Sequence, residues 1–432
     1  MANIKTKENE TLGEKYYNFK HKSGLDVYVF PKNMTSSYAL FATRYGSIDN
    51  KFKLEGEDEF TCVPDGIAHF LEHKMFECED GRDAFELFAE TGASANAYTS
   101  NRQTAYLFSA TDNFYESLEI LLDFVTHPYF TKENVQKEQG IIGQELRMYE
   151  DSPGSRLQRG LMEALYKNNK VRIDVGGTIE SIAEIDAEIL YKCYNTFYNL
   201  NNMALAVCGA VDAQRVEEIC DRVLKKAPEQ RIIRDYEDSE EPKEVYQKRS
   251  VCELSVSKPI FAIGIKDMDI SSDPEQRAKK GYAINILNQM LFSCSGEFYN
   301  TLYDNKMISK YLDAYSEHTE RYSFIQIYSE SSNPEAVYDY FVSFIEKTKK
   351  NGLDREDFEL AKRVEYASNI KSFDSTEEIA GNIIEDLFDG TDIFDAADII
   401  SSISFEYICD LFDSLFKEEY YAMSIVYPSK NN

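Results

Sequence analysis

Residues 130–153 read FTKENVQKEQGIIGQELRMYEDSP, and residues 353–376 read LDREDFELAKRVEYASNIKSFDST. Both stretches have the length and the spacing of apolar residues that are typical of a helix, and they can be laid over one another without a gap. Strand-like and helical segments surround the two stretches in the same order. The sequence therefore predicts an internal duplication, with two α+β domains of one kind.

The length of the chain, 432 residues, is too great for one ordinary hydrophobic core, so we expect two domains of roughly 200 residues. Residues 229–249, EQRIIRDYEDSEEPKEVYQKR, are highly charged, include a proline and have almost no periodic apolar residues. This composition is typical of a linker. We therefore predict an N-terminal domain over 1–228, a linker over 229–249 and a C-terminal domain over 250–432.

The chain has a formal charge of −29, from 76 acidic and 47 basic residues, which argues against nucleic acid as a partner. Such a charge favours solubility, and it could also attract basic peptides. No apolar run approaches the roughly 20 residues that span a bilayer, and the polar N-terminus has no apolar signal core. The eight cysteines form no CxxC pair, and we expect them to be reduced. We therefore expect a cytoplasmic protein with no membrane partner.

Two of the five histidines lie close together in residues 66–77, GIAHFLEHKMFE. On a helix, His69 and His73 are about one turn apart and share a face with Glu72, so both imidazoles can bind one ion. Asp65 is a reasonable N-cap for this helix. The alternative is a surface helix that carries two unrelated histidines, but chance gives a pair at this spacing only about 0.05 times in such a chain. The H-x-x-E-H order is typical of inverzincins, in which the glutamate takes a proton from the metal-bound water.

HFLEH, together with the downstream EQGIIGQE, resembles the pitrilysin/insulinase zinc peptidases. The resemblance covers the whole chain and is strongest over 25–160. It implies zinc-dependent cleavage of peptides, with one Zn²⁺ per chain. In this family the third metal ligand is the second glutamate of an E-x6-E pair on a helix. The resemblance therefore implies His69, His73 and Glu145 as metal ligands, Glu72 as the catalytic base that activates a zinc-bound water, and Glu138 as a residue that supports the ligands.

The same family has a G-x-x-x-N-A-x-T segment, which is present here as GASANAYT over 92–99. The resemblance implies that this segment is an edge strand beside the zinc, where an extended peptide or an unfolded polypeptide is held. An edge strand offers unpaired backbone N–H and C=O groups to such a substrate. The implied substrate-binding residues are Ala95, Asn96, Ala97 and Tyr98.

The chain resembles half-length bacterial relatives of the mitochondrial processing peptidase. Family members are clamshells of four domains, so the resemblance implies two homologous αβ-roll domains here, each with a mixed or antiparallel sheet and helices on one face, and a dimer. The second half has no HxxEH, and Ser368 occupies the position that matches Glu145, so we expect no zinc there. Tyr303 and Lys310 replace an Arg and a Tyr that often complete active sites of the family. A heterodimer with a homologous half-length subunit would supply them; the alternative is a homodimer that does without them or uses other groups.

The sequence thus favours a zinc metalloendopeptidase that cleaves peptides in a clamshell chamber. One alternative is a non-catalytic peptide-binding or structural subunit of a processing-peptidase-like complex. Another is a zinc hydrolase that acts on non-peptide substrates. The intact HxxEH and E-x6-E patterns count against a non-catalytic subunit, because an inactive relic usually loses metal ligands.

Overall fold

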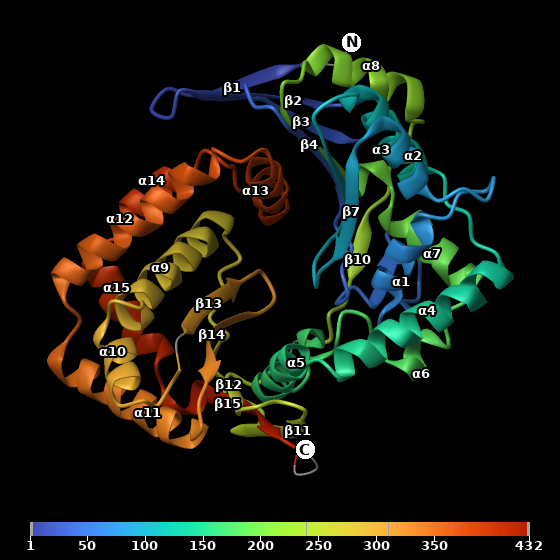
Figure 1. The fold of residues 1–432 in the computed structure, drawn as a ribbon. Coiled ribbons are helices and arrows are strands. Elements are labelled where there is room, and N and C mark those ends of the chain that lie inside the picture. The colour runs from blue at the N-terminus through green and yellow to red at the C-terminus, as the bar shows by residue number, and fades with distance from the viewer. Residues whose placement is uncertain (1–2, 239, 310, 430–432) are drawn as a thin grey trace. The chain divides into compact units, whose positions relative to one another are not determined.

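Two sheets share one five-strand pattern in the computed structural model, which describes residues 3–238, 240–309 and 311–429 (Figure 1). The larger sheet has the order β1-β2-β3-β9-β4-β8-β7, and the other has the order β11-β15-β12-β14-β13. One neighbouring pair is parallel in each, β3–β9 and β11–β15, and the other pairs are antiparallel. Five strands therefore match in order and direction, which confirms the predicted class of two homologous α+β domains with mixed sheets.

Two compact units divide the chain, and the first contains residues up to Leu146, Asp174–Tyr236 and Lys371–Phe388. Its large sheet consists of β1 (Lys5–Asn9), β2 (Glu14–Lys20), β3 (Asp26–Pro31), β9 (Met203–Gly209), β4 (Ser37–Thr43), β8 (Thr104–Ala110) and β7 (Ser94–Thr99). A small sheet consists of β10 (Ile232–Arg234), β5 (Lys51–Leu54) and β6 (Thr61–Cys62). Its helices are α1 (Ile67–Met75), α2 (Ala84–Thr91), α3 (Phe114–Thr126), most of α4 (Lys132–Glu150), α6 (Ile179–Ile182), α7 (Ala187–Phe197), α8 (Ala213–Val223), the short η2 (Leu200–Asn202) and α13 (Thr376–Asp389).

The second unit contains Arg147–Ile173, Glu237–Ile370 and the residues from Asp389 onward. Its sheet consists of β11 (Arg249–Leu254), β15 (Tyr421–Pro428), β12 (Ile260–Asp267), β14 (Ser323–Glu330) and β13 (Leu312–His318). Its helices are α5 (Pro153–Leu165), α9 (Pro274–Phe292), α10 (Glu297–Asp304), α11 (Pro334–Asn351), α12 (Arg355–Ser372), α14 (Ala396–Ser402) and α15 (Phe405–Leu415), with the short η1 (Lys170–Arg172) and η3 (Glu418–Tyr420).

The central strands are buried on both faces, as their nearly continuous apolar sequences predict. Every residue of β4, SYALFAT, and of β9, MALAVCG, is buried. Alternate side chains of these strands face the main core of the first unit, where α1 and α3 pack against the sheet. Phe30, Tyr38 and Leu40 are also buried but lie outside that core, which means that the second face of the sheet needs a cover of its own.

Two equivalent helices provide this cover, and each packs in the unit built mainly from the other half of the sequence. The starts of α4 and α12 are 223 residues apart, from Lys132 to Arg355, and so are the starts of α5 and α13, from Pro153 to Thr376. The overlay of 130–153 on 353–376 therefore relates α5 to α13. Helix α5 belongs to the second unit, and α13 belongs to the first unit.

Helix α5 packs closely on the second face of its sheet. Its apolar residues Leu161 and Leu165 are fully buried, and a Cβ at Gly264 of β12 would lie 2.8 Å from one and 3.1 Å from the other. The missing side chain therefore allows the helix to approach the strand. Burial of each leucine contributes about 1.5–3 kcal/mol, so α5 and its sheet stabilise each other.

Helix α13 and the turn before it cover the corresponding face in the first unit. The rings of Phe373 and Phe30 are 6.1 Å apart, and the Arg44 guanidinium donates to the Leu387 carbonyl at 2.9 Å. The same guanidinium lies 4.7 Å from the ring of Phe388. The compact units thus differ from two consecutive stretches of sequence, and the division into domains over 1–228 and 250–432 with a linker over 229–249 stays a prediction.

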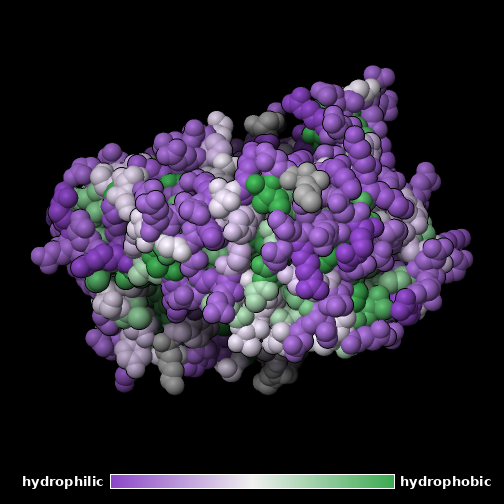
Figure 2. All heavy atoms as spheres, turned by 90° about the horizontal axis from the view of Figure 1, so that it is seen from above, coloured by the Kyte–Doolittle hydropathy of each residue, from purple (hydrophilic) through white to green (hydrophobic). Residues whose placement is uncertain are grey.

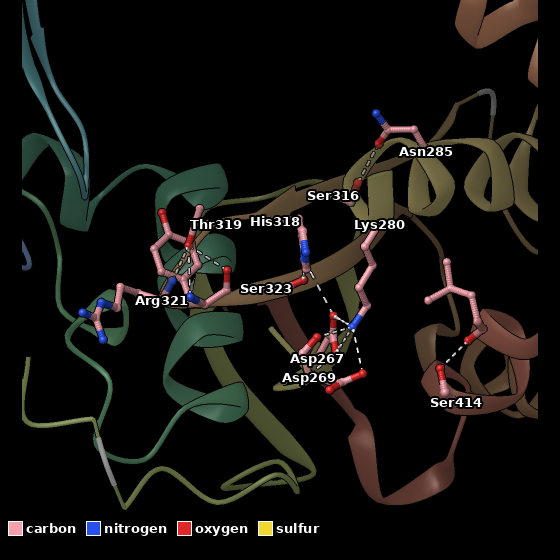
Figure 3. A network of polar contacts seen from close by, with 12 residues as sticks. Asp267, Asp269, Lys280, Asn285, Ser316, His318, Thr319, Arg321, Ser323 and Ser414 are labelled. Carbon is pink, nitrogen blue, oxygen red and sulfur yellow. Dashed lines mark hydrogen bonds and ion pairs between the residues drawn. The ribbon is translucent and has the colours of Figure 1, made fainter. Parts of the chain in front are cut away.

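A buried polar network lies at the end of the second sheet (Figure 3). Lys280 of α9 lies 2.8 Å from the Asp267 carboxylate, and the Nδ1 atom of His318 lies 2.7 Å from the Ser323 hydroxyl. Burial lowers the pKa of His318 to about 4, so its imidazole is neutral at pH 7. The ammonium is therefore compensated by a carboxylate, as a buried charge must be.

The surface drawn in Figure 2 is mostly hydrophilic, with hydrophobic side chains in small groups, as the charge of the chain predicts. No helix in the described ranges has both the length and the apolar character needed to cross a membrane. The eight cysteines are all free.

Helices α5 and α13 are exchanged, in that each packs in the unit built mainly from the other half of the sequence. We therefore predict that neither half is stable alone. Residues 1–228 would lack the cover from α13, and α5 would expose its leucines. We expect the fragments 1–228 and 229–432 to aggregate when each is expressed alone, and to form a folded complex when coexpressed, as measured by size-exclusion chromatography and near-UV circular dichroism. Leu161→Glu should prevent this recovery. A monodisperse fragment 1–228 with a cooperative thermal transition would contradict the prediction.

Candidate metal centre

Helix α1 begins at a position that favours glycine. Its N-cap, Gly66, has a φ of 89°, and a Cβ there would lie 2.3 Å from the carbonyl oxygen of Gly176. The N-cap predicted at Asp65 is therefore wrong. The Asp65 carboxylate instead accepts a hydrogen bond from the Asn50 amide at 3.0 Å, and its backbone carbonyl accepts one from the Ser181 hydroxyl at 2.7 Å. Tertiary contacts, and not a side-chain cap, fix the start of α1.

Both helices that carry the predicted ligands are anchored by apolar residues. Helix α1 buries Phe70, Leu71 and Met75 in the core, while α4 buries Ile142 and Leu146 in the same core. These anchors fix the direction in which the polar face of each helix points. The histidines of α1 and the glutamates of α4 therefore meet at the surface of one core.

The three predicted ligands converge in the structure. The Oε2 atom of Glu145 lies 3.4 Å from Nε2 of His73 and 3.8 Å from Nε2 of His69. One ligand atom from each of the three residues lies within 4.8 Å of the others, and in the described part of the chain this is the only such group of His, Cys, Asp or Glu. Glu145 is thus in one cluster with His73 and His69, although it follows them in the sequence by 72 and 76 positions.

Glu138 lies behind this cluster and contacts one of the histidines. Its Oε1 atom is 3.1 Å from Nδ1 of His73, so it can accept the proton of that nitrogen and leave Nε2 directed toward Glu145. Despite the cost of burial, hydrogen bonds to Glu138 and Glu145 raise the pKa of His73 to about 9. Burial and the neighbouring imidazole lower the pKa of His69 to about 4.

The cluster fits a zinc ion in chemistry and in spacing. Two imidazole nitrogens and one carboxylate oxygen are a ligand set of catalytic zinc sites, which keep a fourth position open. Tetrahedral ligands with bonds of roughly 2.0–2.1 Å have neighbouring atoms about 3.3 Å apart. The observed separations of 3.4 and 3.8 Å are close to this value. His69, His73 and Glu145 could therefore hold zinc without a large rearrangement of either helix.

Glu72 lies beside the cluster and is only 8% exposed. Its Oε2 atom accepts a hydrogen bond of 2.5 Å from the hydroxyl of Thr99, the last residue of β7. Burial raises the pKa of Glu72, and the hydrogen bond from Thr99 opposes that change. The sequence patterns do not indicate a role for Thr99. Its position at the end of GASANAYT was the only available signal, since threonine is common in strands.

The predicted substrate segment is the edge strand β7, which pairs with β8 on one side. Asn96 and Ala97 line a cavity with Glu72 and His73, whereas the Tyr98 hydroxyl accepts a hydrogen bond from the Gln103 amide at 2.8 Å. Ala95 is half-buried and also packs against the core. The backbone N–H of Ala97 donates to the side chain of Asn96 at 2.9 Å, so this donor is already in use.

The cavity beside the cluster has a volume of about 430 Å³. Phe76 and Phe85 form one wall, with rings 4.3 Å apart and nearly parallel, and Ile141 of α4 forms another. Both Phe85, at 45%, and Ile141, at 46%, are unusually exposed for apolar side chains. Most of the other residues that line the cavity are polar or charged, Arg82 and Lys137 among them, so an apolar group would contact only the aromatic wall and Ile141.

The second unit differs at the matching positions. Helix α9 has no histidine, and Ser368 is exposed on α12. Tyr303 is exposed on α10 and stacks on Tyr299, with ring centres 5.8 Å apart. Lys310, the other position predicted to lack a family residue, lies outside the described residues.

Comparisons with known proteins agree with this geometry. The sequence pattern described as Insulinase (Peptidase family M16) matches residues 63–179, and that described as Peptidase M16 inactive domain matches residues 184–365. YmfH of Bacillus subtilis (strain 168), named an uncharacterized zinc protease, is 38% identical over 405 residues, which cover 93% of this chain and 94% of YmfH.

Two solved structures are also similar. A structure described as an M16-like peptidase from Alicyclobacillus acidocaldarius has a TM-score of 0.91 and 30% identity, and the match covers 99% of both chains. A protease from Helicobacter pylori, at 20% identity and a TM-score of 0.80, shares the fold over 96% of this chain and 100% of its own. Since both family patterns and a relative of nearly full length match, the chain belongs to the insulinase family of peptidases, family M16.

Proposed function

We propose that the chain is a zinc-dependent metalloendopeptidase. The observation that carries this proposal is the convergence of His69, His73 and Glu145 beside the buried carboxylate of Glu72. The names of relatives as zinc proteases support it. The pattern named as an inactive domain covers residues 184–365, outside the helices that carry these four residues, so it does not argue against a site in the first unit.

Each side chain at the site has a distinct role in this proposal. When bound by the three ligands, zinc lowers the pKa of a water molecule to about 7 and polarises a carbonyl group. Glu72 accepts the proton of the attacking water and then donates it to the amine that leaves. Glu138 orients His73 through the contact at Nδ1.

The substrate would be held as an added strand along the free edge of β7. An extended peptide can pair with backbone groups of Ala95, Asn96, Ala97 and Tyr98. The peptide would compete with the Asn96 side chain for the backbone N–H of Ala97. The side-chain amide of Asn96 must therefore turn away when the peptide binds. The formal charge of −29 favours basic peptides over acidic ones. The eight free cysteines support a reducing compartment, the cytoplasm, as the place of action.

Substitutions of three glutamates should separate metal binding from proton transfer. Glu145→Gln should weaken zinc binding, because a neutral amide is a poorer ligand than a carboxylate. Glu72→Gln should keep one zinc per chain but lower kcat by at least about 10²-fold, the usual contribution of a general base. Glu150→Gln, the same change at an exposed position of α4, is the control. The measurements are zinc content by atomic absorption and peptide hydrolysis with and without chelator. A fully active Glu72→Gln enzyme would refute the mechanism.

The cavity beside the metal centre predicts a preference for a large apolar side chain next to the scissile bond. Phe85→Ala should lower the kcat/KM for peptides with Phe or Leu at that position about tenfold relative to peptides with Ala, since the pocket loses one aromatic wall. Phe60→Ala, at an exposed phenylalanine that is not among the residues that line the cavity, should leave this ratio unchanged. The measurement is cleavage of a peptide series that varies one flanking position at a time. An unchanged ratio in Phe85→Ala would exclude the cavity as a specificity pocket.

We further propose that the active form is a dimer, in which a homologous half-length subunit supplies the Arg and Tyr that are replaced by Tyr303 and Lys310. Such groups would stabilise the oxyanion that develops on the substrate, an effect worth a few kcal/mol. The pure chain should therefore turn over peptides slowly, and addition of the homologous subunit from the same host should raise kcat at least tenfold. Full activity of the pure chain would reject the heterodimer. Zinc-free preparations that bind peptides without cleavage would instead support a non-catalytic subunit.

A further inference from the structure

We propose that Thr99 is a positioning residue for Glu72, which holds one carboxylate oxygen so that the other is directed to the attacking water. The inference rests on the proposed peptidase function. Its structural basis is the hydrogen bond of 2.5 Å from the Thr99 hydroxyl to the Oε2 atom of Glu72. This is a short contact for an O–H donor, and Glu72 is buried, so loss of the donor would leave an acceptor unpaired.

The count of hydroxyl hydrogens makes Thr99 the donor. Thr104, opposite Thr99 in the β7–β8 ladder, has its hydroxyl 2.9 Å from the backbone carbonyl of Tyr45 and 3.4 Å from the Thr99 hydroxyl. A carbonyl can only accept, so the single hydrogen of Thr104 is committed to Tyr45. The contact between Thr99 and Thr104 could then use only the hydrogen of Thr99, and Glu72, at 2.5 Å against 3.4 Å for Thr104, is the acceptor that this hydrogen reaches at the shorter distance.

The turn after Thr99 is held in place by a second loop. The backbone N–H groups of Ser47 and Ile48 donate to the carbonyls of Ser100 and Asn101 at 3.0 and 3.2 Å. Gly46 permits this contact, because a Cβ there would lie 2.3 Å from the backbone of the turn. The hydroxyl of Thr99 is therefore presented from a fixed strand end and not from a mobile loop.

A fixed donor on Oε2 restricts rotation of the Glu72 carboxylate about its last bond. The Oε1 atom is then the oxygen that remains to take the proton of the water. Without Thr99 the carboxylate could rotate, and the base would be misplaced in a fraction of encounters with substrate. The expected defect is in the chemical step, and substrate binding along β7 should be unaffected.

Two substitutions at Thr99 and one control test this inference. Thr99→Val keeps the branched shape but removes the hydroxyl, and should lower kcat at least tenfold with KM and zinc content within twofold of the wild type. Thr99→Ser keeps the hydroxyl and should retain at least a third of the wild-type kcat. Thr43→Val removes another buried hydroxyl of the same sheet, which bonds the Phe197 carbonyl at 2.6 Å, and should leave kcat unchanged. An unchanged kcat in Thr99→Val, or an equal loss in Thr99→Ser, would overturn the proposal.

A measurement on the metal-free chain separates this inference from the proposed function. In urea unfolding without metal, Thr99→Val should lower the midpoint in the wild-type background and have a clearly smaller effect in a Glu72→Leu background, because the partner is already absent. Equal shifts in the two backgrounds would show that Thr99 does not act through Glu72. If the wild type binds zinc and cleaves no peptide, the proposed function fails, while the urea experiment still decides whether the contact between the two residues exists.

Discussion

The contact of Glu145 with His69 and His73 requires two helices from distant parts of the sequence to be anchored in one core. Polar and charged groups at this point are partly buried, and each needs a partner to offset the loss of water. Glu138 faces His73, and the fully buried ammonium of Lys74 lies 2.6 Å from Glu77. The apolar residues of α1 and α4 fix the direction in which the polar faces point, and the pairing of charges offsets the cost of burying the polar groups that meet there. A change that displaces either helix would therefore separate Glu145 from His69 and His73.

The exchange of α5 and α13 places a second constraint on the chain. Each sheet is apolar on both faces, so each needs helices on both, and the helix that covers the second face comes from the other half of the duplicated sequence. Leu161 against Gly264 and Phe373 against Phe30 are the contacts that show this most directly. Loss of α5 would therefore expose apolar surface in the second unit, and loss of α13 would expose it in the first.

Sequence patterns predicted the fold class and the three residues that form the His-His-Glu cluster, because those signals are local and uncommon. Only five histidines occur, and two of them are spaced to share a helix face. The start of α1 could not be predicted, because Gly66 is selected by its contact with Gly176, more than 100 residues away. The exchange of α5 and α13 between the units could not be predicted either. The apolar face of α5 is evident from its sequence, but the periodicity of the helix does not indicate which sheet that face covers. Thr99 was missed because its partner depends on the register of the β7–β8 hairpin.

The two sheets carry different side chains at one matching backbone position, the last residue of β7 and of β13. The last pair of the β7–β8 ladder is Thr99–Thr104, and the last pair of the β13–β14 ladder is His318–Ser323. In the first unit the small hydroxyl of Thr99 reaches the carboxylate of Glu72 on α1. In the second, His318 contacts Ser323 and lies 3.7 Å from Asp267, which pairs with Lys280 of α9 (Figure 3).

Both arrangements connect a strand end to a helix through buried polar atoms, but they differ in the group that faces the carboxylate. In the second unit the Asp267 carboxylate is taken up by the ammonium of Lys280, and burial keeps His318 neutral, so the cluster has the character of a structural ion pair. In the first unit the hydroxyl carries no charge and satisfies only one oxygen of Glu72. A hydroxyl partner leaves the basicity of a carboxylate largely intact, whereas an ammonium partner stabilises the ionised form and makes the carboxylate a weaker base. Both strand-end side chains, Thr99 and His318, are neutral, so the two units differ in the group that faces the carboxylate: a hydroxyl faces Glu72, whereas an ammonium faces Asp267.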